Sequence, residues 1–277
     1  MIRRVSFRIF RDLVIWMLVL AIVFPLFWMI STAFKPDSET FALPPTLLPH
    51  HPTIEQFVRL FRETPIALWF LNSVIVALLT TVVVVVVALA GAYALVRFRF
   101  PFRRGIAEIV LATYLLPTTV LLLPLYIIIA RIGLANSLFG LALAYITFTL
   151  PFALWLLRGF IVGIPVDLEE AATVDGAGRI GAFIEIVIPQ ALPGIISTAI
   201  FSFILSWNEY LYAMVFINET SRKTLPPGVL GMLNQNQNVQ WALLMAASVV
   251  MALPLVIAFG FLQSHLSRGF GAGAVKG

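Results

Sequence analysis

The chain has 277 residues, of which 61% are hydrophobic and only 11% are charged. A soluble globular domain carries about 25% charged residues. A soluble core of this size cannot bury so much apolar surface, so the solvent must be lipid. The absence of cysteine excludes disulfide bonds, thiol catalysis and cysteine-ligated metals. The net charge of +5 does not indicate nucleic-acid binding, because the basic residues lie in short runs beside apolar segments.

Six apolar stretches are long enough to cross a bilayer, which requires about 20 mainly apolar residues. They are residues 12–34, 69–96, 106–130, 137–160, 190–217 and 241–264. The first stretch is too long for a cleaved signal peptide and is interpreted as an uncleaved span. The sequence therefore predicts an all-α, polytopic membrane protein with six transmembrane helices, in a single domain over residues 1–277.

The basic residues predict which way the spans face. With both termini on the cytoplasmic side, the inner segments hold 12 of the 18 lysines and arginines, and the outer segments hold the other six. Two clusters of four arginines each, in residues 3–11 and 97–104, then lie directly against the inner face of the membrane. The positive-inside rule therefore favours cytoplasmic N- and C-termini.

Two segments are predicted on the outer side. Residues 35–68 hold six prolines, which exclude a long helix. Within them, four apolar residues have the spacing of one face of a short amphipathic helix: Ile54, Phe57, Val58 and Phe61. That helix is expected either on the membrane surface or packed against neighbouring spans. Residues 218–240 form a long polar loop with a Pro-Pro-Gly turn and an Asn/Gln run, which is either functional or a solvated linker.

The inner segment between the fourth and fifth spans, residues 161–189, predicts a short helix. Pro165 suits the first turn of a helix. Asp167, Glu169 and Glu170 follow near the N-terminus, where the helix dipole favours negative charge. One face of this helix is formed by Leu168, Ala171, Ala172 and Asp175. Small residues on that face permit close approach by another protein surface.

The same segment predicts a turn and a second helix. Gly176 and Gly178 are placed to end the first helix. A second helical stretch follows until Pro189, with an apolar stripe formed by Ile180, Phe183, Ile184 and Val187. The sequence therefore predicts a cytoplasmic helix–turn–helix that leads directly into the fifth span.

This segment resembles the signature of ABC importer permeases: Glu-Ala-Ala, three residues, Gly, nine residues, Ile, one residue, Leu, Pro. The matching residues here are Glu170-Ala171-Ala172, Gly176, Ile186 and Ile188-Pro189, with Ile188 standing where the family has leucine. Two further features are similar to the carbohydrate-uptake branch, namely Asp175-Gly176-Ala177 and Trp207-Asn208-Glu209-Tyr210. Within that branch, the chain resembles the maltose-type second permease over nearly its whole length.

The resemblance implies a function and a location. The chain would be the transmembrane permease subunit of an ATP-driven, binding-protein-dependent importer in the bacterial inner membrane. It would form half of the translocation path for a sugar. A homologous second permease, two ATP-binding cassette subunits and an extracytoplasmic sugar-binding protein would complete the importer. The partner ATPase would bind ATP and Mg, because this chain has no Gly-x-x-x-x-Gly-Lys-Ser/Thr motif and is expected to have no cofactor or enzyme activity.

The resemblance also implies roles for two loops. The residues that would form the coupling helix, seated in a groove of the ATPase, are Glu170, Ala171, Ala172, Asp175 and Gly176. The outer loop of residues 218–240 would contact the binding protein.

A sugar path requires polar and aromatic side chains that face the interior of the helix bundle. The candidates are Asn72, Tyr145, Ser206, Asn208, Glu209 and Tyr212. Hydroxyl groups such as that of Ser206 are more simply explained by helix–helix contacts. Glu209 is a different case, because a charge at membrane depth is costly and usually faces a cavity or a partner.

Other functions are less well supported by the sequence. A permease for a substrate other than a sugar stays open. A self-contained secondary transporter is disfavoured because the chain shows no convincing internal repeat. An intramembrane enzyme is disfavoured because the spans hold no His-Glu-x-x-His motif and no Ser–His pair. No catalytic residue and no metal ligand is predicted. The inner helix–turn–helix argues against a purely structural subunit.

Overall fold

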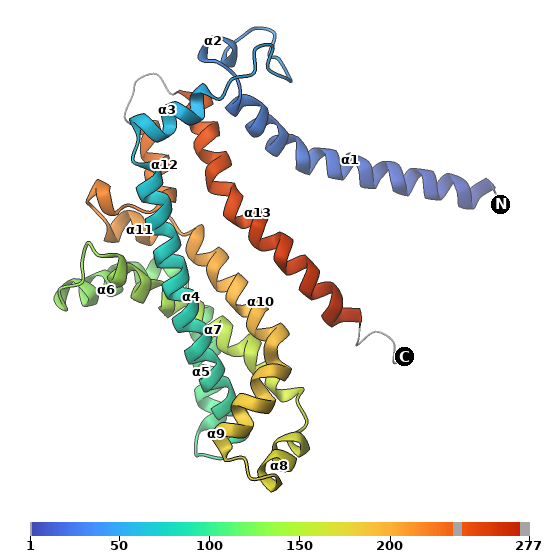
Figure 1. The fold of residues 1–277 in the computed structure, drawn as a ribbon, viewed down its shortest axis with the longest axis vertical. Coiled ribbons are helices and arrows are strands. Elements are labelled where there is room, and N and C mark those ends of the chain that lie inside the picture. Colours follow the sequence, from blue (N-terminus) through green and yellow to red (C-terminus); the bar gives the residue numbers. More distant parts are fainter. Residues whose placement is uncertain (1, 235–239, 272–277) are drawn as a thin grey trace. The chain divides into compact units, whose positions relative to one another are not determined.

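The computed structural model describes residues 2–234 and 240–271, with side chains for residues 10–233 and 240–260. These residues form helices joined by loops, and no strand occurs among them (Figure 1). The elements are α1 (Ile2–Ala33), α2 (Asp37–Thr40), α3 (Glu55–Glu63), α4 (Ile66–Arg97), α5 (Arg103–Tyr114), α6 (Thr118–Arg131), α7 (Leu138–Val162), α8 (Val166–Val174), α9 (Arg179–Ala182), the π-turn η1 (Phe183–Val187), α10 (Ile188–Trp207), α11 (Leu211–Phe216), the 3-10 turn η2 (Thr220–Arg222), α12 (Leu225–Asn234) and α13 (Trp241–Gly271).

The structure confirms the all-α class and most of the predicted spans. Within the described residues, five helices are long and apolar enough to cross a membrane: Phe10–Ala33, Ile66–Arg97, Leu138–Val162, Arg179–Trp207 and Trp241–Gly260. The predicted span 106–130 is not one straight helix, because the chain bends by 101° between α5 and α6. The break falls at Pro117, which lacks an N–H donor and disfavours helical geometry in the preceding residue. There are six spans when this bent pair is counted as one.

The predicted fifth span, residues 190–217, is wrong at both ends. The helix begins at Arg179, continues through η1 and ends at Trp207. The chain then breaks at residues 208–210 and restarts as α11. Pro189 does not end the inner helix as predicted. The wider π-turn precedes it, with the N–H of Ile188 bonded to the carbonyl of Phe183 five residues earlier, so the helix continues into α10.

The chain divides into two compact units, Met1–Ala67 with Gly228–Leu253, and Leu68–Pro227 with Pro254–Gly277. In the second unit, α4 and α7 contribute to two clusters of buried apolar side chains, one shared with α11 and the other with α10. Alanine is frequent in both, as at Ala142 and Ala213 in the first and Ala88 and Ala153 in the second. Small residues let helix backbones approach closely, and such close packing is what holds helices together in lipid.

In the first unit, α1 and α3 expose apolar side chains. Most side chains of α1 between residues 10 and 30 are exposed, as expected of a helix that faces lipid. The short helix predicted in the outer segment is confirmed as α3. Three of the four predicted apolar residues, Ile54, Val58 and Phe61, are exposed, whereas Phe57 is half-buried with its ring 5.1 Å from that of Phe34. Gln56 and Leu60 on the other side are buried. The exposed apolar face fits the prediction of a helix on the membrane surface.

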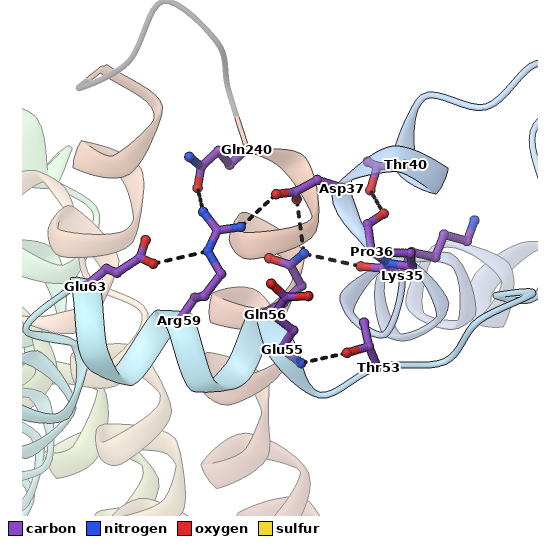
Figure 2. A network of polar contacts seen from close by, with 10 residues as sticks. All are labelled: Lys35, Pro36, Asp37, Thr40, Thr53, Glu55, Gln56, Arg59, Glu63 and Gln240. Carbon is purple, nitrogen blue, oxygen red and sulfur yellow. Dashed lines mark hydrogen bonds and ion pairs between the residues drawn. The ribbon is translucent and has the colours of Figure 1, made fainter.

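The buried side of α3 belongs to a polar network centred on Arg59 (Figure 2). The guanidinium donates to Asp37 at 2.7 Å, to Glu63 at 3.2 Å and to Gln240 at 2.9 Å. Gln56 donates to the second oxygen of Asp37 at 3.0 Å. The hydrogen bond to Glu63 and that to Asp37 raise the pKa of Arg59, against the effect of burial. The network therefore ties α3 to α2 and to the residue that precedes α13.

The predicted polar loop of residues 218–240 contains a helix. Pro226, Pro227 and Gly228 form no separate turn, because they lie in the first turn of α12, where a missing N–H costs no hydrogen bond. Leu225 and Val229 of this helix are buried. Residues 235–239, which hold most of the Asn/Gln run, lie outside the described residues.

Candidate functional site

The predicted helix between the fourth and fifth spans is present as α8. Its first turn carries Asp167 and Glu169, as predicted. At its end, Gly176 has a φ of 94°, a left-handed conformation that glycine adopts without strain. The N–H of Ala177 bonds to the carbonyl of Ala172 at 2.9 Å, and the N–H of Gly176 to that of Thr173 at 3.1 Å. This pair of bonds is the Schellman arrangement, so the prediction that glycine ends the helix is confirmed.

α8 presents an exposed surface of mixed character. Of the residues predicted to couple, Glu170, Ala171, Asp175 and Gly176 are exposed, whereas Ala172 is half-buried. The sequence interpretation named Ile180 in an apolar stripe but did not single out Val174. Val174 is 88% exposed and Ile180, just beyond the turn, is 75% exposed. α8 and the turn after it therefore expose both apolar and acidic side chains.

Glu169 has a role that sequence interpretation missed. Its side chain is only 10% exposed and forms an ion pair with Arg97, with Nε and Oε1 separated by 2.5 Å. Arg97 also donates to the carbonyl of Ile164 at 2.8 Å, and Tyr93 donates to the other carboxylate oxygen at 3.0 Å. The sequence suggested only a favourable position near a helix N-terminus. The structure shows that Glu169 fastens α8 to the end of α4.

The second arm of the loop is attached to the same end of α4. The ring of Phe183 in η1 lies 4.5 Å from that of Tyr93, and the guanidinium of Arg179 lies 5.6 Å from the ring of Phe98. The predicted apolar stripe is divided by the π-turn. Phe183 and Val187 face inward, whereas Ile180 and Ile184 are exposed. The register shift arises because a π-turn holds more residues than an α-turn.

A cavity of about 420 Å³ lies where two helix breaks meet. One break separates α5 from α6, the other separates α10 from α11, and α7 also contributes to the wall. The lining combines aromatic rings with hydroxyl groups and a carboxylate: Thr113, Tyr114, Leu116, Thr118, Leu121, Thr147, Phe148, Leu205, Glu209 and Tyr212. This composition suits a ligand that offers both hydroxyl groups and an apolar face.

Glu209 lines the cavity and also holds the break in place. Its carboxylate accepts the N–H of Tyr212 at 2.9 Å and that of Ala213 at 3.1 Å, which caps the start of α11. Tyr212 donates its hydroxyl to the carbonyl of Thr118 at 2.7 Å, which joins α11 to α6. The buried hydroxyl of Tyr145 lies near Glu209 but has no close hydrogen-bond partner within the described residues. The structure therefore brings together three of the six candidates, Tyr145, Glu209 and Tyr212.

The other three candidates for the path do not line this cavity. Asn208 is exposed and bonds to the carbonyl of Ile204 at 3.1 Å, at the end of α10. Ser206 is buried with a hydroxyl that has no partner among the described residues, consistent with a packing role. Asn72 is buried, and both hydrogen bonds of its amide go to carbonyls of the 218–224 loop, Ser221 at 3.0 Å and Lys223 at 2.9 Å.

The 218–224 loop is held from two sides. Asn136, in the left-handed region with φ 54°, accepts the N–H groups of Asn218 and Glu219 on its side-chain oxygen. The hydrogen bond from Ser221, together with the nearby charge of Arg222, lowers the pKa of Glu219. The loop is therefore fixed by the α6–α7 connection on one side and by α4 on the other. No group of His, Asp or Glu within the described part of the chain is placed to hold a metal.

Membrane-spanning helices, a cavity at two helix breaks and an exposed helix–turn–helix define a subunit of a membrane transporter. The inner membrane components of binding-protein-dependent transport systems form a family whose sequence pattern matches residues 85–271. The chain belongs to this family, which comprises the permease subunits of ABC importers, and the ATPase of such importers is a separate subunit.

Named relatives support the assignment. The chain is 36% identical to the diacetylchitobiose uptake permease DasC of Streptomyces coelicolor, over 98% of each chain. It is 34% identical to the trehalose/maltose transport permease MalG of Thermococcus litoralis, over 96% of each chain. A bacterial ABC transporter that imports the acidic polysaccharide alginate has a chain of the same fold, with a TM-score of 0.82 and 20% identity over 94% of this chain and 96% of that one.

The turn after α8 is expected to depend on Gly176. Gly176→Val places a β-branched residue at a φ of 94°, where it is strained by roughly 1–2 kcal/mol. No atom lies within 4 Å of the added Cβ, so the effect comes from the backbone alone. Limited proteolysis of the purified chain should show faster cleavage between residues 172 and 180. Gly178→Ala is the control, because Gly178 has a φ of −71° and open space around it. Equal cleavage rates in both variants would contradict the assignment.

Proposed function

We propose that this permease moves a sugar, a mono-, di- or oligosaccharide, through a path that includes the cavity at the two helix breaks. The observation that carries the proposal is the lining of that cavity. Sugars bind through hydrogen bonds to their hydroxyl groups and through stacking of their C–H faces on aromatic rings. The cavity offers the carboxylate of Glu209 and the rings of Tyr114, Phe148 and Tyr212. The names of DasC and MalG, which refer to disaccharides, point to the same substrate class.

The proposal includes the partners and the orientation. Residues 1–277 act as one permease domain with cytoplasmic termini, beside a homologous second permease. Two ATP-binding cassette subunits bind ATP and Mg, and one of them receives α8 through Glu170, Ala171, Ala172, Asp175 and Gly176. An extracytoplasmic sugar-binding protein contacts the segment of residues 218–240. The exposed surface of α8 and the 12 to 6 bias of basic residues support this arrangement.

The sugar assignment is tested by reconstituting the complete importer in liposomes and measuring ATP-dependent uptake. Labelled maltose, trehalose and diacetylchitobiose are compared with labelled amino acids and inorganic phosphate. Uptake of at least one sugar, and of neither other class, is expected. Uptake of an amino acid or phosphate alone would establish a permease for a non-sugar substrate instead. Uptake by this chain alone along an ion gradient would establish a secondary transporter.

Glu209 is expected to be needed for uptake. Glu209→Ala removes both the cavity carboxylate and the cap of α11, and the lost cap costs about 1 kcal/mol. Uptake should fall at least tenfold while the amount of assembled complex stays within twofold. Asn208→Ala should lower uptake less, because its amide lies outside the cavity lining. Ser197→Ala, in α10 and outside the cavity lining, is the control and should transport like wild type. A parallel loss of complex and uptake in Glu209→Ala would reduce Glu209 to a structural cap.

α8 is expected to be the contact with the ATPase. Ala172→Trp adds a large ring to the docking face, and Glu170→Lys reverses an exposed charge at a helix cost of about 1 kcal/mol or less. Each should insert normally but lose either co-purification of the ATPase or coupling of hydrolysis to uptake. Val162→Trp, exposed at the end of α7, is the matched control. Wild-type uptake in both α8 variants would show that this helix does not couple.

The orientation can be tested directly because the chain has no cysteine. Leu43 and Val174 are 91% and 88% exposed, so single cysteines there will react with a membrane-impermeant maleimide when they face the reagent. In intact spheroplasts that express the chain without its ATPase, Leu43→Cys should label, and Val174→Cys should label only after lysis. The reverse pattern would invert the proposed topology.

A further inference from the structure

One end of α4 is fastened to both arms of the α8 loop. Arg97 and Tyr93 bind the buried carboxylate of Glu169, and Arg97 also binds the carbonyl that precedes α8. The ring of Tyr93 also contacts that of Phe183 in the second arm, with the two ring planes tilted by 44°. Because the ion pair is largely removed from water, breaking it leaves an uncompensated charge, which is far more costly than losing a surface pair. Movement of α8 is therefore transmitted to this end of α4.

The other end of α4 is fastened to the 218–224 loop and the start of α12. Trp69 donates its indole N–H to the carbonyl of Thr220 at 2.9 Å. Asn72 donates to two further carbonyls of the loop. The hydroxyl of Ser73 accepts the N–H of Leu225 at 2.7 Å. Four hydrogen bonds thus hold the loop and the start of α12 on residues 69–73, less than two turns of α4, and the three side chains that form them are all buried.

Between these ends α4 is continuous. It is one helix of 32 residues without a proline, about 48 Å long at 1.5 Å per residue. The other long described helices each contain proline: Pro25 in α1, Pro151 in α7, Pro193 in α10 and Pro254 in α13. The helix that follows the turn after α8, from Arg179 to Trp207, also contains a π-turn and ends at the 208–210 break. Proline and π-turns are where helices bend, so α10 is a compliant connection and α4 is a stiff one.

We propose that α4 is the strut that connects the binding-protein side of this permease to its ATPase side, with Arg97–Glu169 as the inner tie and Trp69 and Asn72 as the outer tie. This inference rests on the proposed function, since it assigns the 218–224 loop to the binding protein and α8 to the ATPase. Docking of the binding protein on the 218–224 loop, or movement of the ATPase against α8, displaces α4 as a rigid body, because packed helices shift rather than deform continuously. Trp69, Asn72, Tyr93, Arg97 and Glu169 are then positioning residues that touch no substrate.

The test uses the complete importer in liposomes and measures three quantities: basal ATP hydrolysis, its stimulation by sugar-loaded binding protein, and uptake. Glu169→Gln opens the inner tie. Asn72→Ala and Trp69→Phe open the outer tie, and the latter keeps a ring while removing only the N–H donor. Each should lower the stimulation ratio and uptake at least fivefold, with basal hydrolysis and complex yield within twofold of wild type. Arg99→Gln and Leu71→Ala, both exposed and near the two ends of α4, are matched controls and should behave like wild type.

Two double variants distinguish transmission through α4 from independent local defects at its two ends. The exchange Arg97→Glu/Glu169→Arg restores an ion pair and should recover at least half of the stimulation lost in Glu169→Gln. The combination Asn72→Ala/Glu169→Gln should be no worse than the more severe single variant, because one opened tie already disconnects the strut. Losses that multiply would show two independent local defects and overturn the proposal. Wild-type stimulation in every single variant would overturn it as well.

If the inner-tie variants assemble poorly, the outer-tie variants alone test whether α4 connects the two loops. Normal stimulation in Trp69→Phe and Asn72→Ala would then count against the strut. Failure of the proposed function looks different. A wild-type complex whose ATPase responds to its loaded binding protein but which imports no sugar refutes the sugar assignment and leaves the strut measurements interpretable. A wild-type chain that assembles with no ATPase refutes both.

Discussion

A chain surrounded by lipid must satisfy every backbone hydrogen bond within itself, and this requirement decides where the helices of this permease stop. At the 208–210 break, carbonyl groups in the last turn of α10 and N–H groups in the first turn of α11 lose their backbone hydrogen-bond partners. The carboxylate of Glu209 replaces two of them at the start of α11, and the amide of Asn208 binds a carbonyl at the end of α10. The irregular backbone is tolerated because it lines a cavity rather than facing hydrocarbon. The cavity and the break are therefore one feature.

The features that depend on local chemistry could be predicted from the sequence. The long apolar stretches, the start of α8 after Pro165 and its end at Gly176 require only neighbouring residues, and the structure confirms them. The role of Glu169 could not be predicted, because its partner Arg97 lies 72 positions earlier in the chain. Each residue alone is explained locally. The helix dipole accounts for Glu169 near the start of α8, and the positive-inside rule accounts for Arg97. Only the fold shows that the two charges meet in a buried pair.

The errors in helix boundaries share a physical cause. Each error involves a proline. The predicted span 106–130 runs through Pro117, whereas the chain breaks there between α5 and α6. At Pro189 a preceding π-turn lets the helix continue, and at Pro226 the residue lies in the first turn of α12. Whether proline breaks a helix depends on which carbonyl it leaves unpaired and on what else can bind that carbonyl, and neither is visible in a linear pattern.

The distribution of rigid and compliant helices gives a mechanical account of the subunit. A transporter must change the access to its cavity, so some of the lining has to move. Here the lining comes from the helices with breaks, α5–α6 and α10–α11, together with α7, which contains Pro151. α4 contributes nothing to the lining, yet it binds the loops at both of its ends. A helix that lined the cavity and also linked the loops would have to bend and transmit at once. Here the two tasks belong to different helices. α4 links the 218–224 loop to the α8 loop and keeps their relative position, while the broken helices that line the cavity rearrange beside it.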